Sequence, residues 1–500
     1  MSKGTEFVAV DLGAESGRVV LAQLAEGRMR LEPVHRFANG PVQVLDHLHW
    51  DILRLFSEVK QGIARCGQNN GAGLAGIAVS TWGVDFALLD EAGELLRVPY
   101  CYRDPRTEGM MDRVFARMPR DELFRHTGIQ FMPLNSLYQL YATALTEPKV
   151  LDAAATFLMI PDLLNYWLSG VKSCELTIAS TSQLLAVDEQ AWARPVLDRL
   201  ALPASVFPEL VAPGTVLGAL HGTVADAVAL PEVPIIASAA HDTAAAVAAT
   251  PVLPGNDQFA YINSGTWSII GLELDAPVIS DSSLEHNFTN ERGVGGKYMY
   301  RKNNMGLWLL QECRREWAGA GQSLGYAELT ELAARAPVCG PIVEPDHESF
   351  LAPGAMTPRI AAFCRATGQT PPDGIGATVR CVLESLALKY RWIIDRLEET
   401  TGRAVPVVHL MGGGSKSSLL CRATANATGR RVIAGPAEAT VAGNVMLQAI
   451  ATGHLDAIAQ GRAVVRDSFA LTEYEPQDRE QWEAAYKRFL AMRESTSTWL

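Results

Sequence analysis

The sequence predicts an α/β protein built from two domains of similar design. Three observations support this prediction: the length of 500 residues, the alternation of short apolar runs with amphipathic helical stretches, and a strand-turn-strand pattern that occurs twice. A chain of this length usually exceeds what a single hydrophobic core organises, so two domains of ordinary size are expected. A cleft between the two domains is therefore expected.

Composition narrows the class of protein and its partners. With 48% apolar and 20% charged residues, the chain falls in the globular range. The formal net charge is −12 and the sequence shows no basic tract, so we expect no nucleic-acid partner. No apolar stretch is long enough to cross a bilayer, and the amino terminus lacks a signal-peptide pattern. We expect a cytoplasmic monomer without a membrane partner.

The eight cysteines form no CxxC pair and no Cys/His spacing typical of a metal site. Reduced thiols in a reducing compartment are the expectation for such a pattern. The sequence leaves open whether Cys364 and Cys381 pair.

The first domain is expected to open with three strands, because β-like runs at 7–10, 18–23 and 29–37 are separated by turn residues. A helix follows from Asp51, since apolar residues at 52, 55, 56, 59 and 63 fall on one helical face. A further strand is expected at 75–79. Strands followed by a helix and another strand favour a mixed sheet.

The second domain repeats this opening, with strands at 259–262 and 267–273 around the turn 263–266. A long helix at 377–399 then precedes strands at 407–411 and 431–434 and helices from about 417, 438 and 478. This order is an α/β alternation. We place the domains at residues 1–248 and 249–500, because Pro and Gly residues near 250–255 form a loop there.

Two similar openings indicate a duplicated fold whose turns face each other across a cleft. This is the actin-like, ribonuclease-H-like arrangement: two domains that flank a central cleft for ATP and a sugar.

The first turn, residues 11–18, has the composition of a phosphate-facing hairpin. Its glycines permit close approach of the backbone to a ligand, the Ser16 hydroxyl can donate to a phosphoryl oxygen, and Asp11 can hold Mg²⁺ through water. The alternative is a plain hairpin turn, which a single Asp-x-Gly would favour. The second turn, at 263–267, has the same composition, and no Walker loop is present. Together the two turns favour a polyphosphate held from both sides.

The glycine triplet at 412–414 lies between an expected strand and an expected helix. Missing side chains at that position leave room for adenine or phosphate near a helix amino terminus. A tight turn is the alternative reading.

Asp242 is the candidate catalytic carboxylate. It follows a strand-like run at 235–238 and begins an Ala-rich helix. Sugar hydroxyls hardly ionise at neutral pH, so phosphoryl transfer to one needs a group that accepts its proton. The alternative is an Asp that caps the helix.

Several segments of the sequence resemble the FGGY family of carbohydrate kinases, and the resemblance spans nearly the whole chain. The segments are VDLGAESGR at 10–18, TWGVDFALLD at 81–90, YRDPRT at 102–107, HDTAAAV at 241–247, INSGTWS at 262–268, NFTNERG at 287–293 and KNNMGLWLLQ at 302–311, together with the glycine triplet. TWGVDF, HDT and NFTNE together resemble the branch of this family that acts on L-rhamnulose.

The resemblance implies an ATP- and Mg²⁺-dependent kinase that converts L-rhamnulose into L-rhamnulose 1-phosphate in L-rhamnose catabolism. It also implies roles for particular positions. The nucleotide would be contacted by Ala14, Glu15, Ser16, Gly17, Arg18, Thr266, Gln311 and Gly413. The sugar would be contacted by Gly83, His241, Asp242, Thr243 and Asn303, with Asp242 as the proton acceptor.

Glu15 departs from the family pattern, in which a small residue is common. A carboxylate beside a triphosphate is repelled, so we expect the Glu15 side chain to point outward or to pair with Lys or Arg. Two alternatives stay open at this point: a kinase for L-fuculose or L-xylulose, and a non-enzymatic actin-like ATP-binding protein.

Overall fold

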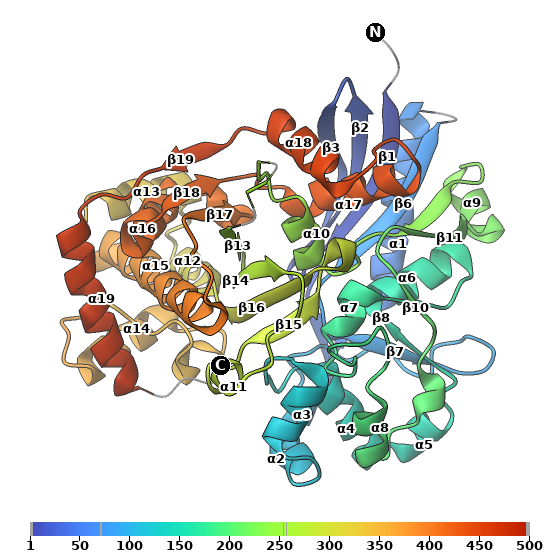
Figure 1. The fold of residues 1–500 in the computed structure, drawn as a ribbon, viewed down its shortest axis with the longest axis horizontal. Coiled ribbons are helices and arrows are strands. Elements are labelled where there is room, and N and C mark those ends of the chain that lie inside the picture. Colours follow the sequence, from blue (N-terminus) through green and yellow to red (C-terminus); the bar gives the residue numbers. More distant parts are fainter. Residues whose placement is uncertain (1–3, 71–72, 254, 257, 497–500) are drawn as a thin grey trace. The chain divides into compact units, whose positions relative to one another are not determined.

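The computed structural model describes residues 4–70, 73–253, 255–256 and 258–496, and it divides into two compact units (Figure 1). Unit 1 comprises Met1–Pro254, Glu273–Tyr300 and Ala439–Ser468, and unit 2 comprises Gly255–Leu272, Arg301–Glu438 and Phe469–Leu500. The units interleave along the chain, whereas the predicted domains follow from one cut at residues 248 and 249. That cut stays a prediction of domain organisation.

Unit 1 contains thirteen complete strands and thirteen α-helices among the described residues. The strands are β1 (Thr5–Leu12), β2 (Ser16–Ala25), β3 (Arg28–Ala38), β4 (Pro41–Val44), β5 (His47–Trp50), β6 (Leu74–Thr81), β7 (Phe86–Leu89), β8 (Thr156–Met159), β9 (Cys174–Glu175), β10 (Leu210–Val211), β11 (Thr215–Ala219), β12 (Pro234–Ala237) and β15 (Thr289–Arg292). The helices are α1 (Ile52–Asn70), α2 (Met110–Phe115), α3 (Arg120–Thr127), α4 (Ser136–Thr146), α5 (Pro148–Asp152), α6 (Ile160–Ser169), α7 (Leu176–Ser180), α8 (Arg194–Arg199), α9 (Gly222–Val228), α10 (Asp242–Ala248), α11 (Asp281–Glu285), α17 (Ala439–Ala451) and α18 (Ile458–Ser468).

Unit 2 contains the remaining elements. Its strands are β13 (Phe259–Ser264), β17 (Val407–Met411), β18 (Arg431–Ala434) and β19 (Thr472–Tyr474), and the strands β14 (Trp267–Leu274) and β16 (Tyr298–Met305) have residues in both units. Its helices are α12 (Trp308–Gly319), α13 (Tyr326–Ala334), α14 (Met356–Ala366), α15 (Gly374–Thr401), α16 (Ser418–Thr428) and α19 (Arg479–Glu494).

The six-stranded sheet of unit 1 has the order β11-β12-β6-β1-β2-β3. β1, β2 and β3 are antiparallel neighbours, whereas β6 runs parallel to β1 and β12 runs parallel to β6. Alternate side chains of a strand point to opposite faces of its sheet, and β1 packs against neighbours on both faces. On one face, Val8 and Val10 share a hydrophobic core with Ile52 and Leu55 of α1. On the other face, the ring of Phe7, the neighbour of Val8 in β1, contacts His454, which follows α17.

The seven-stranded sheet has the order β15-β16-β14-β13-β17-β18-β19. β13 and β14 form an antiparallel hairpin, β17 runs parallel to β13, and β18 runs parallel to β17. The hairpin β1-β2 and the parallel strands β6 and β12 have the same arrangement in unit 1. The two sheets therefore share the arrangement of these four strands, and the predicted α/β class with a repeated opening is confirmed.

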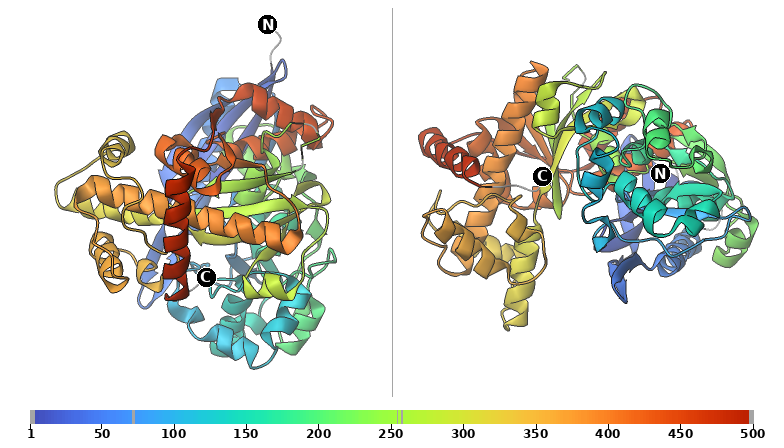
Figure 2. Two further views of the ribbon diagram at one scale, coloured as in Figure 1. Left: turned by 60° about the vertical axis from the view of Figure 1, so that its left-hand side comes forward. Right: turned by 90° about the horizontal axis from the view of Figure 1, so that it is seen from below.

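The long helix α15 is crossed by the carboxyl-terminal helix α19 in unit 2 (Figure 2). The Arg391 guanidinium of α15 bonds both carboxylate oxygens of Glu483 on α19, at 2.8 and 3.1 Å. The structure confirms the predicted helices and strands of this region, with β17 and β18 at the predicted bounds. All eight cysteines are free thiols, including the buried Cys364 and Cys381.

Candidate active site

Asp242 is the first residue of α10 and lies just beyond the carboxyl end of β12. Its side chain is 29% exposed, so it is not part of the packed core. The buried Thr243 hydroxyl donates to Asp242 Oδ1 at 3.1 Å. His241 occupies the cap position and its side chain makes no capping hydrogen bond, so Asp242 is not the residue that caps this helix. A carboxylate in the first turn is favoured by the helix dipole.

The segment before Asp242 is attached to the end of β6. The Thr81 amide donates to the Ala240 carbonyl at 2.8 Å, and the Ser80 hydroxyl donates to the Ala239 carbonyl at 2.8 Å. The TWGVDF segment therefore leaves β6 beside the HDT segment. In open α/β sheets, ligands bind at the carboxyl ends of the parallel strands, where both segments lie.

His241 lies between two carboxylates of unit 1. Its Nδ1 is 3.3 Å from Glu291 Oε2, and its Nε2 is 3.5 Å from Asp242 Oδ1. The side chains of His241 and Glu291 are 6% and 4% exposed. An imidazole held by Glu291 on one side can fix the orientation of the Asp242 carboxylate on the other. Glu291 belongs to the NFTNERG segment, so unit 1 brings three of the quoted segments together.

Asp85, in the TWGVDF segment, is a buried carboxylate with four hydrogen-bond donors around it. Trp50 Nε1 and Trp82 Nε1 donate to its Oδ2 at 2.6 and 3.0 Å, the Tyr102 amide donates at 3.2 Å, and Gln139 Nε2 donates to Oδ1 at 2.9 Å. Burial raises the pKa of Asp85 to about 6, although these donors favour the charged form. The carboxylate fixes the Trp82 indole next to Gly83.

Val84 adopts a left-handed backbone conformation with φ of 69°, which is strained for a β-branched residue. The Thr181 hydroxyl accepts from the Val84 amide at 3.0 Å, and the Val84 carbonyl accepts from the Ser136 hydroxyl at 2.5 Å and from Gln139 Nε2 at 3.3 Å. A Cβ on Gly83 would lie 3.1 Å from the Thr181 side chain. The turn that carries Gly83 is therefore held in one shape by its surroundings.

The first turn connects β1 to β2, and the Gly13 amide closes it by donating to the Ser16 carbonyl at 2.9 Å. Ser16 and Glu15 are exposed, which agrees with the expectation that Glu15 points outward or pairs. Gly17 has a packing reason to be glycine, because a Cβ there would overlap Phe37. Ala14 is half-buried.

Asp11 is paired with Arg18 across the same hairpin. Arg18 Nε and Nη2 donate to Asp11 Oδ2 at 2.8 and 2.7 Å. The described residues contain no group of three or more His, Cys, Asp or Glu side chains that could hold a metal ion by themselves. Mg²⁺ commonly keeps several waters and uses one or two carboxylates together with substrate phosphates, so a single Asp11 carboxylate fits a water-mediated contact.

In unit 2, the second turn is bonded to the start of α12. The Leu307 amide donates to the Gly265 carbonyl at 2.8 Å, and the Gly306 and Trp308 amides donate to the Thr266 carbonyl at 3.1 and 3.2 Å. A Cβ on Gly306 would lie 2.5 Å from the Trp267 carbonyl carbon. Only glycine allows this close approach, which sets where Thr266 lies.

The glycine triplet packs against the same turn. A Cβ on Gly412 would lie 2.7 Å from Asn263 Oδ1, and one on Gly414 would overlap the Ser264 hydroxyl. Gly413 differs, since its nearest neighbour on that side is the Ser264 carbonyl oxygen at 3.9 Å. The open space at Gly413 fits the prediction that a flat or anionic ligand lies there.

Gln311 and Asn303 are the remaining predicted residues of unit 2. Gln311 lies on α12, and its buried Oε1 has no hydrogen-bond partner among the described residues, so an acceptor is available to a ligand. Asn303 lies on β16, and its Oδ1 accepts from Arg301 Nη1 at 2.8 Å. Thr266, Gln311 and Gly413 thus share unit 2, while Gly83, His241, Asp242 and Thr243 share unit 1. The ligand roles of these residues stay predictions.

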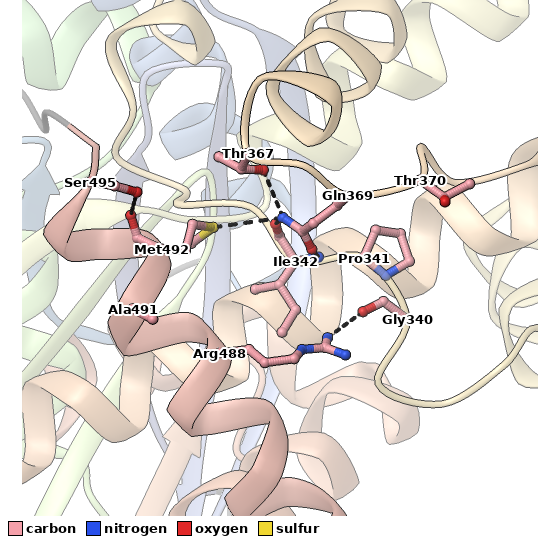
Figure 3. A pocket seen from close by; sticks show the side chains of 10 residues that line it. All are labelled: Gly340, Pro341, Ile342, Thr367, Gln369, Thr370, Arg488, Ala491, Met492 and Ser495. Atoms are coloured by element: carbon pink, nitrogen blue, oxygen red, sulfur yellow. Dashed lines mark hydrogen bonds between the residues drawn. The ribbon is translucent and has the colours of Figure 1, made fainter.

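A cavity of about 610 Å³ lies elsewhere in unit 2, between α19 and the loops around Gly340 and Gln369 (Figure 3). Arg488 donates to the Gly340 carbonyl at 2.5 Å, and Gln369 Nε2 donates to the Ile342 carbonyl at 2.8 Å. None of the predicted site residues lines this cavity.

Two family profiles match the chain: the N-terminal domain of the FGGY family of carbohydrate kinases at residues 7–249, and the C-terminal domain of that family at residues 260–452. The chain belongs to this family. The predictions of an FGGY kinase and of a carbohydrate-kinase activity that uses ATP are therefore confirmed, and a non-enzymatic actin-like protein is not favoured.

Relatives of this FGGY chain cover nearly its whole length. A rhamnulokinase from Bacteroides thetaiotaomicron is 43% identical over 486 residues, which cover 97% of this chain and 98% of the relative. A rhamnulokinase from Oceanobacillus iheyensis is 37% identical over 467 residues, or 93% of this chain and 97% of the relative. The structure of a gluconate kinase from Lactobacillus acidophilus has a TM-score of 0.82 at 16% identity, covers 98% of this chain and 97% of its own, and shows the shared fold.

No helix in the described part of this FGGY chain is both long and apolar enough to span a membrane.

The sequence did not single out Asp85, Glu175 or Glu291, although the structure places all three next to predicted site segments. Asp85 and Glu291 lie inside the quoted segments TWGVDF and NFTNERG, but nothing in the local pattern separates a buried carboxylate from an exposed one. Glu175 lies in CELTIAS, where a lone acidic residue among apolar ones is the only signal.

Proposed function

We propose that this FGGY kinase transfers the γ-phosphoryl group of ATP to the 1-hydroxyl of L-rhamnulose and so produces L-rhamnulose 1-phosphate. The observation that carries this proposal is the partly exposed Asp242 carboxylate at the carboxyl end of the unit-1 sheet, with His241 and Glu291 behind it. The rhamnulokinases among its full-length relatives support the choice of sugar.

In the proposed reaction, Asp242 accepts the proton of the sugar hydroxyl. Phosphoryl transfer passes through a loose transition state, so the proton leaves late and a carboxylate of ordinary basicity suffices. Thr243 and His241 contact Asp242 Oδ1 and thereby orient the carboxylate. Gly83 and Asn303 would position the sugar for this step.

The proposed nucleotide contacts are Thr266, Gln311 and Gly413 in unit 2, and the Ala14–Arg18 turn in unit 1. ATP supplies the phosphoryl group, and Mg²⁺, contacted through water by Asp11, would neutralise phosphate charge. The open space at Gly413 and the buried, unpartnered Oε1 of Gln311 support the contacts proposed for unit 2. A cytoplasmic location and a monomeric state stay predictions.

The first prediction concerns Asp242→Asn. An amide cannot accept the proton, so we expect kcat for L-rhamnulose phosphorylation to fall about 100-fold or more. Calorimetric binding of L-rhamnulose and of ATP should stay within about twofold of the wild type, because the change preserves shape. Asp121→Asn, a matched change at an exposed position on α3, should leave kcat unchanged. Full turnover by the Asp242 variant would remove this residue from the mechanism.

The sugar itself is tested by identifying the product. Incubation with ATP and L-rhamnulose, L-fuculose or L-xylulose in turn, followed by mass spectrometry and NMR, should show efficient conversion of L-rhamnulose to its 1-phosphate. Preferred conversion of either other ketose would overturn the choice of sugar while leaving the family unchanged.

A further inference from the structure

We propose that the segment 175–181 is the positioning element of the sugar site in unit 1, with Glu175 and Thr177 as positioning residues for Asp242. This inference rests on the proposed role of Asp242. The segment comprises Glu175, the helix α7 and Thr181, and its side chains bond three of the segments that the proposed site uses.

Glu175 is fully buried and its carboxylate accepts four hydrogen bonds. Two come from Thr177, from its amide at 2.8 Å and its hydroxyl at 2.5 Å, and one comes from the Ile178 amide at 3.2 Å. The fourth comes from the Ala240 amide at 3.0 Å. The carboxylate therefore caps α7 and at the same time holds the backbone two residues before Asp242.

Thr177 extends this contact by one residue. Its hydroxyl accepts from the His241 amide at 3.3 Å while it donates to Glu175 Oε2. The two consecutive amides that precede Asp242 are thus both bonded to the segment 175–181, one to Glu175 and one to Thr177 of α7. Because a helix begins at Asp242, fixing these amides fixes the direction in which α10 leaves and where its first carboxylate lies.

The same helix holds the segment that carries Glu291. The Ser180 hydroxyl accepts from the Arg292 amide at 2.9 Å, and the neighbouring Glu291 contacts His241. His241 is therefore set by α7 from two directions, through its own amide and through Glu291. A shift of α7 would move both carboxylates that flank the imidazole.

Thr181 completes the element on the side of the predicted sugar contact. Its hydroxyl accepts from the Val84 amide at 3.0 Å and donates to the Ile178 carbonyl at 2.8 Å. The strained turn beside Gly83 is thereby tied to the helix that also holds the Asp242 loop. One short helix sets the spacing between the sugar contact and the proton acceptor.

A cap for a five-residue helix does not require a fully buried carboxylate, because Ser, Thr or Asp at a partly exposed cap position would serve. Burial of a charge is costly unless hydrogen bonds compensate. Here burial raises the pKa of Glu175 to about 7. The titratable groups next to it are Asp162, whose Oδ1 accepts from the Glu175 amide, and Cys174, whereas His241 bonds Thr177 through its backbone amide.

The ionised form of Glu175 accepts all four bonds, whereas a protonated carboxyl must turn one oxygen into a donor. We therefore expect the loop to be held most firmly above neutral pH. A dependence of kcat on the ionisation of Glu175 would not be expected if Glu175 only stabilised the fold.

The test compares Thr177→Val with Thr177→Ser in the full chain. Valine keeps the volume but removes the hydroxyl, while serine keeps the hydroxyl. We expect T177V to lower kcat for L-rhamnulose by about tenfold with KM for ATP within about twofold of wild type, and T177S to restore kcat. Glu175→Gln should lower kcat similarly and flatten the rise of kcat with pH near 7. Thr181→Val should instead raise KM for the sugar.

Hydrogen exchange of the amides at 238–243 supplies a readout that does not depend on activity. We expect these amides to exchange at least about tenfold faster in T177V and E175Q than in wild type and T177S. Unchanged exchange, or equal kcat in T177V and T177S, would overturn the proposal. If wild type phosphorylates no ketose, the proposed function fails, and the exchange data still decide whether 175–181 holds the loop.

Discussion

Asp85 shows how a buried side chain can set the shape of a site without touching a ligand. Its carboxylate accepts hydrogen bonds from the indole N–H groups of Trp50 and Trp82. It also accepts from Gln139 Nε2, which donates to the Val84 carbonyl as well. The two indole rings lie 4.3 Å apart between centroids. The wall beside Gly83 is thus a rigid aromatic pair whose orientation depends on one carboxylate.

Asp85→Asn should therefore weaken sugar recognition. An asparagine side chain has only one acceptor oxygen, so either the two indole N–H groups or Gln139 Nε2 would face an NH2 group and lose their acceptor, and the turn at 82–84 loses its fixed shape. We expect KM for L-rhamnulose to rise about tenfold, equivalent to the loss of about 1.4 kcal/mol, with KM for ATP unchanged. Steady-state kinetics with each substrate varied in turn measures the two constants.

Asp104→Asn is the matched control for this prediction. Asp104 is also a buried carboxylate of unit 1, but it accepts from the Leu48 and Arg106 amides and makes no bond to the 82–84 turn. The Asp104→Asn substitution should lower the stability of the protein without a selective loss of sugar affinity. Equal effects of the two variants on KM for the sugar would mean that Asp85 acts only through stability.

The connection between β16 and α12 illustrates a constraint that belongs to an element. Gly306 lies directly against the turn that carries Thr266, and its Cα faces backbone atoms of Gly265, Trp267 and Ser268. Backbone atoms cannot turn aside as a flexible side chain can. Any larger residue at 306 must displace either the turn or the first residues of α12.

Gly306→Ala should therefore weaken nucleotide binding. We expect the Kd for ATP, measured by calorimetry, to rise about tenfold and the protein to lose about 1–3 kcal/mol of stability. Gly319→Ala, at the last residue of α12, is the control, because no atom lies within 4 Å of its added Cβ. That variant should keep ATP affinity and be slightly more stable, as is usual for Gly to Ala at a compatible helical position. Unaltered ATP binding in G306A would separate this turn from the nucleotide site.

Elements with a strong local pattern could be predicted from the sequence. β17 and β18 are short runs between turn signals, apolar except for His409 and Arg431, and the structure gives them the predicted bounds. α1 follows from one apolar face whose residues Ile52, Leu55, Val59 and Ile63 are all buried. The repeated hairpins with glycine turns could also be found, since strands and turns are encoded within a few residues.

The positioning groups could not be predicted, for a physical reason. α7 has five residues, too few for a helical period, and Glu175 is separated by 65 residues from the Ala240 amide that it holds. Asp85 meets Trp50 and Gln139 from 35 and 54 residues away. These contacts exist only after the sheet of unit 1 has formed. A candidate for the catalytic carboxylate can be found from its motif, whereas the groups that hold it depend on tertiary structure.

In the whole molecule, buried acidic side chains make the stability of the fold depend on pH. Burial raises the pKa of Asp85 to about 6 and that of Glu175 to about 7, in each case above the ordinary value of the carboxyl group. Between about pH 4 and 7 the folded protein therefore binds protons at these sites that the unfolded chain has already released. Their contribution to stability is present at low pH and is lost as pH rises through the folded pKa values.

Two other groups with shifted pKa values, Glu344 and Lys302, act mainly outside the window from pH 5 to 7. The pKa of Glu344 is lowered below its usual value despite burial, because Lys389 and Arg493 lie beside it, so its effect falls below that window. Burial lowers the pKa of Lys302 to about 7, so its effect on stability appears mainly above that value. Measurements at pH 5 and 7 therefore report chiefly on the raised acids, among which Glu384 has a pKa of about 7.

We expect the stability of the wild type, relative to Asp85→Asn or to Glu175→Gln, to fall by about 1–2 kcal/mol between pH 5 and pH 7. Neither amide titrates, so each variant lacks the contribution of its own acid while keeping that of the others. Urea unfolding followed by tryptophan fluorescence at both pH values gives the four free energies needed for each comparison. Asp121→Asn, at an exposed acid, should show no such change with pH.

Activity should respond in the opposite direction, since ionised Glu175 holds the Asp242 loop. We therefore expect kcat to rise over the same pH range in which these acids reduce stability. A relative stability that stays constant or rises from pH 5 to 7 would show that the carboxyl groups at 85 and 175 are ionised throughout, and it would remove the basis for a kcat that depends on Glu175.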